Sequence, residues 1–444
     1  MQLTSLRTAL AAASCGLLGI APSAATAAAD PAQVDSALLY YSEKDRVSVA
    51  EAAAIVTVPL ADEETLTVIP IFDSITGASP NGATPTNVAQ PFGVTTTTPA
   101  GQLPVQQFND QRYALSLSWQ YPIDRMNRSA VGAEFSTEKD YRSIGASYSR
   151  MRDFNEKLTT LTLGLSGSLD TVVPSGGIVP QGLTAVSTSV PTTTASVDAA
   201  LVHTTTRASG IVVGGGSGSD GSTAPHEIRD KQVVDGMVGV TQVINRRTLM
   251  QFNYSLGFTT GYMTDPYKII SMVDGGTGST TGYITELRPD FRLRQSLYWK
   301  TVLHLPQDVI HLSYRYYWDD WNIRSQTVDL HYHLKLGKSG YYLEPQLRYY
   351  TQSAADFYHH NLVNGAALPD FASADYRLAQ MASHTYALKF AVPTGKDGEL
   401  SARLMRMKQT GNSHPDDAIG VQRSLDLYPG LEATSLQFSW SFKF

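Results

Sequence analysis

Charged residues are scarce in this chain of 444 residues, since Asp, Glu, Lys and Arg make up only 17% of it. A soluble globular domain usually has roughly 25%. The apolar share, 42%, is ordinary, so uncharged polar residues carry most of the polarity. The 34 Lys and Arg residues do not outnumber the 40 Asp and Glu residues. A basic surplus is lacking, and no nucleic acid is expected as a partner.

Cysteine is almost absent, because Cys15 is the only one in the sequence. It lies within residues 1–29, which have the pattern of a secretory signal peptide: Arg7, an apolar run over 9–20 and small residues at 25–29. Removal of this segment would leave a protein without disulfides or thiolate metal sites. A lipid anchor on Cys15 is the alternative, and it is disfavoured because the apolar run continues beyond this residue.

The rest of the chain lacks an uninterrupted apolar run of the ~20 residues that a membrane-spanning helix needs. Its apolar residues are instead arranged in alternation with polar ones. Near the C-terminus, apolar residues alternate with polar ones, which is typical of a strand with one apolar face. A final strand that ends in Phe also resembles the sorting signal of bacterial outer-membrane barrels. We therefore interpret four aromatic residues as a signal for the barrel assembly machinery: Phe438, Trp440, Phe442 and Phe444.

Segments of this kind recur along the chain and predict an all-β fold, a transmembrane antiparallel β-barrel. Sixteen strands are predicted, with fourteen as the alternative. The predicted strands cover 34–41, 46–58, 65–73, 111–121, 129–136, 141–151, 158–169, 231–244, 248–259, 285–304, 308–318, 324–336, 341–350, 384–392, 399–407 and 434–444.

The connections between these segments follow a parity rule. The long ones, 74–110, 170–230, 261–284, 351–383 and 408–433, all fall in one alternating set, and the other set is short. Bacterial barrels have short periplasmic turns and longer extracellular loops. The pattern predicts one barrel domain over 30–444 with both termini periplasmic. A Ser/Thr/Gly-rich stretch at 173–224 is interpreted as a flexible insertion in an extracellular loop.

A secreted, soluble β-sandwich or propeller is the alternative fold, because such proteins also have many short alternating strands. It does not explain the tyrosines at predicted strand ends, such as Tyr40, Tyr41, Tyr349 and Tyr350. Aromatic residues gather at both membrane interfaces of a barrel. The sequence therefore favours a barrel surrounded by the lipid of a bacterial outer membrane.

Six short segments carry a further signal. They cover 73–83, 108–112, 136–141, 264–268, 314–321 and 355–358, and the first contains the run Thr-Gly-Ala-Ser-Pro-Asn-Gly-Ala. In these segments the chain resembles the proteobacterial outer-membrane barrels classed as domain of unknown function 3570. The resemblance implies an outer-membrane location and no established activity, and it hints at a link to an envelope redox system. The stretch at 173–224 departs from the family's pattern.

Charged residues fall on the polar face of four consecutive predicted strands. They are Arg292, Arg294, His311, Arg315, Asp329, His331, His333, Glu344 and Arg348, called here the lumen cluster. Adjacent strands lie ~4.8 Å apart, so these side chains can meet. The first interpretation is that opposite charges pair and stiffen the wall. The alternatives are a surface that selects solutes, or a metal site of His311, Asp329, His331 and His333.

Acidic and aromatic residues are predicted at the outer strand ends: Asp265, Asp319, Asp320, Trp321 and Asp356. Such a set could hold calcium, and no other cofactor is expected. The ordinary interpretation is loop closure, in which Asp accepts backbone N–H bonds and Trp321 anchors in the membrane interface. Residues 79–82, Ser-Pro-Asn-Gly, predict a turn in an ordered loop that folds into the lumen as a constriction.

Motifs for an enzyme are weak. Residues 216–221 match G-x-G-x-x-G but lie in a low-complexity run, and residues 136–139 match S-x-x-K outside a helix. The first functional hypothesis is an outer-membrane channel, transporter or conduit with a charged lumen. The second is a non-transporting barrel that anchors or assembles a complex with other envelope proteins. A lipid hydrolase is third, because no Ser-His-Asx set with suitable spacing was found.

Overall fold

The computed structural model describes residues 31–90, 98–174, 182–187, 212–213, 228–395 and 397–444. The predicted signal peptide at 1–29 and most of the predicted insertion at 173–224 lie outside these ranges. Among the helices of the described residues, none is long and apolar enough to cross a membrane.

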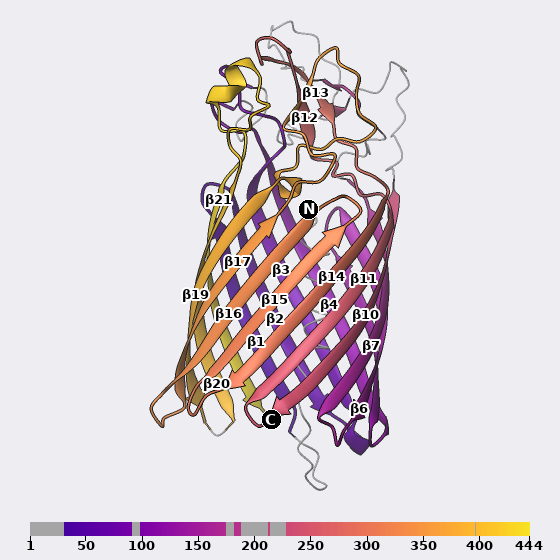
Figure 1. Cartoon of the computed structure of the whole chain (residues 1–444), viewed down its shortest axis with the longest axis vertical. Coiled ribbons are helices and arrows are strands. Elements are labelled where there is room, and N and C mark those ends of the chain that lie inside the picture. The colour runs from indigo at the N-terminus through magenta and orange to yellow at the C-terminus, as the bar shows by residue number, and fades with distance from the viewer. Residues whose placement is uncertain (1–30, 91–97, 175–181, 188–211, 214–227, 396) are drawn as a thin grey trace, which may run out of the picture.

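Sixteen antiparallel strands close into one barrel (Figure 1). They are β1 (Gln33–Glu43), β2 (Val47–Pro59), β3 (Thr65–Pro80), β4 (Val105–Asp124), β5 (Asn127–Thr137), β6 (Tyr141–Phe154), β7 (Thr159–Val172), β10 (Arg229–Asn245), β11 (Thr248–Gly261), β14 (Phe291–His304), β15 (Val309–Asp319), β16 (Arg324–Leu336), β17 (Tyr341–Gln352), β19 (Met381–Thr394), β20 (Gly398–Gly411) and β21 (Leu431–Lys443).

The sixteen-strand prediction is confirmed, and the fourteen-strand alternative is wrong. Each predicted segment overlaps one barrel strand. The largest difference is at 285–304, because β14 begins only at Phe291 and Thr285 ends a separate short strand. The last three residues of that short strand, Tyr283 to Thr285, are buried in the loops above the barrel, and the prediction joined the end of this strand to β14.

The alternation along each strand assigns its two faces. Large apolar side chains such as Leu38, Leu165 and Phe438 are 62%, 59% and 51% exposed, and they form the outer wall. Polar residues on the opposite face line the lumen and pair there across strands. Closure of β1 onto β21 leaves no free edge, which satisfies the requirement that backbone groups within lipid bond to one another.

Both ends of the barrel chain lie on one rim, because Gln33 at the start of β1 is opposite Lys443 at the end of β21. The connections on that rim are short, at 60–64, 125–126, 155–158, 246–247, 305–308, 337–340 and 395–397. The long ones, at 81–104, 173–228, 262–290, 353–380 and 412–430, all leave from the other rim. The predicted parity is confirmed, and which rim faces the periplasm stays a prediction.

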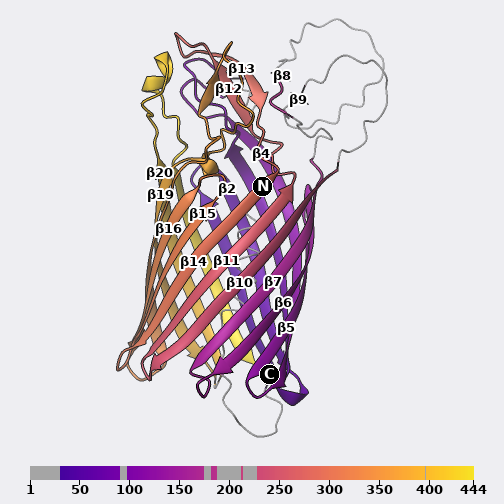
Figure 2. The same cartoon turned by 45° about the vertical axis from the view of Figure 1, so that its right-hand side comes forward.

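The described parts of the five long connections fold together into a cap above this second rim (Figures 1 and 2). We use the name cap for residues 81–90, 98–104, 182–187, 262–290, 353–380 and 412–430. It contains a three-stranded sheet in the order β13 (Thr280–Thr285), β12 (Ile269–Val273), β18 (Asn361–Val363). A short pair, β8 (Val186–Ser187) and β9 (Val212–Val213), lies beside it, and η2 (Tyr376–Leu378) and η3 (Gly420–Ser424) are single turns.

Two sequence predictions about these loops need correction. Part of the stretch expected to be a flexible insertion is docked on the cap, since Thr184 bonds to Thr285 at 3.0 Å and Val186 is buried. The described residues of the loop after Pro80, 81–90 and 98–104, lie in the cap and not in the lumen. β3 continues three residues beyond Gly77, the last residue opposite β2, and Asn81 then accepts a bond from Ile269 N at 2.8 Å within the cap.

The assignment of faces can be tested in the middle of β7. Arginine at Leu165 would face the bilayer and should destabilise the barrel by about 2–4 kcal/mol, the cost of a cation near the midplane. Arginine at the adjacent Ser166, which faces the lumen, is the matched control and should cost far less. Urea unfolding in lipid vesicles measures both. Equal losses in the two variants would contradict the assignment.

Candidate functional site: a charged lumen beneath a cap

The lumen cluster lies on the inward face of β14 to β17, where the alternation predicted it. The register places Val302 opposite His311, and His311 opposite His331. Asp329 is in turn opposite Arg348 on β17. This register decides which of these residues lie close enough to pair.

His331 is the centre of a connected group in this wall. Its two ring nitrogens lie 3.2 Å from Asp329 and 3.2 Å from Glu344. Arg403 contacts the same Glu344 oxygen at 3.1 Å, and His333 lies 3.7 Å from its other oxygen. The interpretation of paired charges that stiffen the wall fits this part of the cluster.

Three members of this network were not predicted: Lys389, Glu399 and Arg403. Lys389 donates to Glu399 at 2.9 Å and to the Tyr342 hydroxyl at 2.6 Å. All three lie on the polar faces of β19 and β20, the next two strands of the barrel. The same alternation that identified the predicted cluster would have found them, had it been followed two strands further.

A second ion pair connects β14 to β10 across the intervening strand β11. Arg294 on β14 donates to Asp235 on β10 at 3.1 Å, and Gly257 of β11 lies between them in one row. A Cβ on Gly257 would collide with the Asp235 carboxylate. Glycine at this position therefore opens the space for the ion pair. Nearer the cap, Arg292 pairs with Asp319 at 2.5 Å.

Two cations of the cluster have no such partner. Among the residues that the structure describes, no carboxylate forms an ion pair with Arg315 or Arg348. The Arg315 guanidinium lies over the Tyr298 ring, 5.4 Å from its centre. The pairing interpretation is therefore incomplete, since part of the positive charge of this wall stays available to the lumen.

The lumen as a whole separates charge between two halves. On the inward face of β1 to β10, carboxylates predominate: Asp35, Glu43, Glu51, Asp73, Asp110, Glu134, Asp153, Asp170 and Asp235, against Arg112, Arg128, Arg229 and Lys231. On β11 to β21, cations predominate: Arg292, Arg294, Lys300, Arg315, Lys335, Arg348, Lys389, Arg403 and Lys443, against Asp319, Asp329, Glu344 and Glu399. These halves face each other across the bore, because they are the two halves of the strand ring.

The predicted metal sites do not assemble. In the described ranges, no three His, Cys, Asp or Glu side chains are grouped closely enough to hold a metal ion. His331 already has a carboxylate at each ring nitrogen, so neither nitrogen is free to bind a metal. The calcium site considered for the acidic residues at the rim is likewise not formed among the described residues.

Those rim residues close loops instead. Asp320 accepts a bond from Leu293 N, and Asp356 accepts one from Asn322, both at 2.9 Å. Asp319 accepts one from Ile323 N at 2.8 Å. These contacts match the interpretation of Asp as an acceptor in turns.

Trp321 does not anchor in the membrane interface, and that interpretation is wrong. Its side chain is only 4% exposed, and it packs edge-on against Phe357, with ring centres 5.0 Å apart. Met263 and Leu378 belong to the same apolar cluster. Trp321 therefore helps to form the hydrophobic core that joins the cap to the barrel rim, a role that depends on loops distant in sequence.

Asp265 belongs to a group that the sequence did not predict. Six charged residues from two long connections meet inside the cap, and we name them the cap ion cluster: Asp265, Lys268, Glu286, Arg288, Asp375 and Arg377. All but Arg377, whose side chain is 30% exposed, are buried. Three carry a negative and three a positive formal charge, so the cluster is neutral overall.

The ion pairs of this cluster are short. Arg288 contacts Glu286 at 2.6 Å and Asp375 at 2.8 Å. Arg377 contacts Asp375 at 2.5 Å and Asp265 at 2.8 Å. These contacts join the connection between β11 and β14 to the connection between β17 and β19.

Lys268 and Tyr267 extend the cap ion cluster to other parts of the chain. The Lys268 amine donates to the carbonyl of Pro80 at the end of β3, and Tyr267 donates to Asp140 at the barrel rim. The cap is therefore held both to itself and to the barrel by polar contacts.

The pKa values of two of these carboxyls shift in opposite directions. Burial raises the pKa of Glu286, and Arg288 offsets only part of the rise. Burial also acts on Asp375, but Arg377, Lys268 and Arg288 together lower its pKa well below the usual range. A buried charge that lost its partner would be costly, so the cap depends on all of these pairs.

The aromatic residues predicted as an assembly signal lie on the outer face of β21. Phe438 and Trp440 are about half exposed there, and the Trp440 and Phe442 rings are 4.4 Å apart. Phe444 follows the strand at its end. The positions agree with the prediction, and recognition by an assembly machinery stays a prediction.

The fold and the lumen define a class: a sixteen-strand transmembrane barrel with a charge-separated bore and a folded cap. Within that class, the chain belongs to the family described as "Protein of unknown function (DUF3570)", whose model matches residues 7–442. The resemblance inferred from the six short segments is thereby confirmed, and all six lie at the cap end of the barrel. No curated protein sequence matches the chain.

Several solved structures are similar to the chain at low sequence identity. A bacterial polysaccharide outer membrane secretin is 9% identical, with 94% of this chain and 100% of that chain covered and a TM-score of 0.43. OccK5 (OpdH) of Pseudomonas aeruginosa is 8% identical, with 94% and 98% covered and a TM-score of 0.40. A ferric enterobactin receptor mutant (PfeA) of the same species is 10% identical, with a TM-score of 0.42. The match covers 93% of this chain and 61% of the receptor.

Loss of one member of the cap ion cluster should loosen the cap without opening the barrel. Arg288→Met leaves Glu286 and Asp375 without their shared cation, and we expect local destabilisation of about 3–5 kcal/mol. Arg406→Met is the control, because its ion pair with Glu432 is exposed, and it should cost at most about 1 kcal/mol. Hydrogen exchange of residues 262–290 measures the effect. Unchanged protection in Arg288→Met would contradict this account.

Glu138, in the turn between β5 and β6, should make stability depend on pH. Burial and the nearby Asp110 raise its pKa to about 7. The folded protein then binds a proton that the unfolded chain has released, so stability should fall as pH rises from about 4.5 to about 7, by at most about 1.4 kcal/mol per pH unit.

The Glu138→Gln variant should lose this part of the pH dependence, whereas Glu63→Gln, at an exposed position, should retain it. Urea unfolding at a series of pH values gives the comparison. If the wild type and Glu138→Gln have parallel stability curves between pH 4.5 and 7, the raised pKa is wrong.

Proposed function

We propose that the protein is an outer-membrane channel or conduit whose charge-separated bore guides small charged solutes and whose cap screens its entrance. The observation that carries the proposal is the separation of lumen charge, with carboxylates predominating on one half of the ring and cations on the other. Pairing alone does not require this arrangement. A wall that served only to be rigid would have its charges balanced locally.

A transverse separation of charge creates an electric field across the bore. Low-dielectric walls that carry one sign of charge focus such a field and raise the local concentration of opposite ions. Anions would follow the side of Arg315 and Arg348, and cations the side of Glu134. The inward positions of β6 and β7 are mostly Ser, Thr and Gly, so these strands leave more of the bore open than β14 to β17 do.

The proposed orientation follows from the loops. Short turns and both ends of the barrel chain would face the periplasm, and the cap would face the exterior, as in other bacterial barrels. The chain would reach the outer membrane after removal of residues 1–29 and would be inserted by the barrel assembly machinery. In this role it would need no cofactor and would catalyse no reaction.

A second candidate is a non-transporting barrel that anchors or assembles an envelope complex, including one with a redox function. The observation in its favour is the cap itself. Loops that serve only as connections rarely contain a hydrophobic core and a cluster of five paired charges, whereas a folded surface above the membrane is suited to bind another protein. The two candidates differ in whether the bore conducts.

Conductance across a planar bilayer separates these candidates. The channel hypothesis predicts a stable current. Removing positive charge with Arg315→Ala and Arg348→Ala together should shift the reversal potential in a salt gradient toward cation preference. Glu134→Gln should shift it in the opposite direction. Arg406→Ala, which faces lipid, should leave it unchanged.

Absence of current over a wide voltage range from correctly inserted barrels would reject the channel hypothesis and favour the anchor. Conduction with identical reversal potentials in all variants would show that the lumen charges do not control passage. High salt should weaken the differences, because the screening length falls from about 10 Å at 0.1 M to about 3 Å at 1 M.

A further inference from the structure

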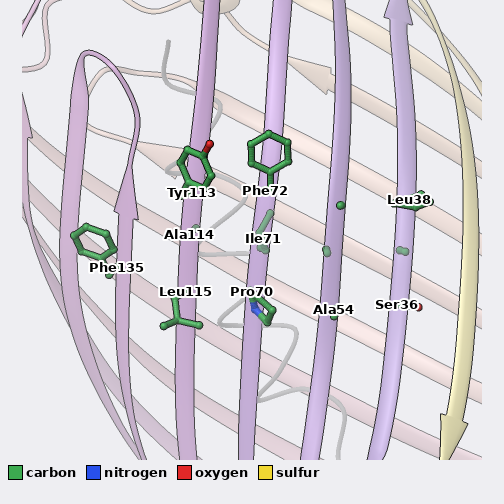
Figure 3. Close-up of a pocket in the computed structure, with 13 residues that line it drawn as sticks. Ser36, Leu38, Ala54, Pro70, Ile71, Phe72, Tyr113, Ala114, Leu115 and Phe135 are labelled. Atoms are coloured by element: carbon green, nitrogen blue, oxygen red, sulfur yellow. The ribbon is translucent and has the colours of Figure 1, made fainter.

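The outer wall of the barrel is not uniform, because a groove crosses β1 to β5 on the side that faces lipid (Figure 3). Its volume is about 630 Å³. Ser36, Ala54 and Pro70 lie along its floor, and Leu38, Phe72 and Tyr113 stand beside it. No other part of the proposed function uses this surface.

The outer side of the groove floor carries little side-chain material. Ala52 and Ala54 present only methyl groups to the outside. Of the inward residues that line the groove, Ala37, Ala53 and Ala114 are small, and Ile71 is large. At this height the outer face of β2 is therefore close to bare backbone.

Pro70 interrupts the backbone pairing at the same place. Proline has no N–H to donate to a neighbouring strand. Along β2 and β3 the pairing is continuous to Ala53 and Ile71 and resumes at Val56 and Val68, so the two intervening pairs are missing. Within hydrocarbon, a backbone group without a partner is costly, and close packing over the gap reduces its exposure.

The gap at Pro70 has a counterpart elsewhere in the barrel. Pro345 on β17 interrupts the ladder with β16 in the same way, between His331 and Leu334. There the neighbouring strand carries large outward side chains, Leu330 and Leu334. Beside Pro70 the neighbouring strand β2 offers only Ala52 and Ala54, and this combination of the gap with small outward residues distinguishes the floor of the groove.

We propose that this groove is a binding site for one acyl chain of a bilayer lipid, which lies on the alanine floor and covers the gap in the ladder. The groove faces the hydrocarbon of the membrane, so an acyl chain is what reaches it. Between two apolar partners in lipid, packing contact rather than the hydrophobic effect drives association. A concave floor supplies more such contact to a flexible chain than a flat wall does.

Shape and polarity select the acyl chain over other occupants. A second barrel presents a convex wall, which would rest on the projecting Leu38, Tyr113 and Phe135, each at least half exposed, without filling the floor. A lipid headgroup would need polar partners, and the Ser36 hydroxyl already donates to the carbonyl of Trp440 at 3.0 Å. The site therefore recognises hydrocarbon and is independent of what the lumen conducts.

Filling the groove tests the proposal. The double variant Ala52→Leu and Ala54→Leu should exclude the chain, whereas Ala146→Leu and Ala402→Leu add the same volume to the outer faces of β6 and β20. Barrels extracted from vesicles of phosphatidylethanolamine would be examined by native mass spectrometry. We expect one retained lipid in the wild type and in the control, and about tenfold less retention in the groove variant.

A second measurement does not depend on the folding of a variant. Phosphatidylethanolamine with a photoactivatable group within its acyl chain should crosslink to the wild-type barrel mainly on β2 and β3. Crosslinks spread evenly around the outer wall, or equal loss of lipid in both double variants, would overturn the proposal. A change of oligomeric state confined to the groove variant would also overturn it, in favour of contact between two copies.

Conductance measured on the same samples keeps this test separate from the proposed function. The acyl-chain site predicts a difference in lipid retention whether or not the bore conducts.

Discussion

The requirement that every backbone N–H and C=O within hydrocarbon finds a partner is the constraint on which this structure depends. Pairing of β1 with β21 meets it by closing the sheet, and the sixteen-strand ring encloses a bore wide enough to be lined by polar side chains. Two gaps in the strand pairing, at Pro70 and Pro345, have different surroundings. Leu343 and Leu347 flank one on the outer face, and a groove lies over the other.

Closure also explains where charge is found. Because most outward positions are apolar, many ionisable residues of the strands are directed into the lumen, where they either pair or face water. The His331 network pairs, whereas Arg315 and Arg348 do not. The cap ion cluster repeats the principle away from the membrane. Five of its six charged residues are buried, and five of the six form ion pairs within the cluster, whereas Lys268 donates to the carbonyl of Pro80.

Most of the barrel could be predicted from the residues, because its signal is local. A strand such as β7 shows its outward Leu161, Leu163, Leu165 and Leu169 in fourteen consecutive residues, and the parity of the loops then orders the strands. The inward direction of Arg292 or His331 followed from the same alternation. The soluble alternative was set aside for the same reason, since its strands would not need an apolar face on every member of a closed ring.

Residue order along each strand thus establishes the number of strands, their faces and the rim that carries the long loops, because side chains alternate with a period of two over short distances. Packing in three dimensions establishes the rest. Arg288 and Asp375 are 87 positions apart, and Lys268 and Pro80 are 188 apart. No periodicity relates such residues, so the cap, the burial of Trp321 and the pairing across Gly257 exist only once the loops and strands have met.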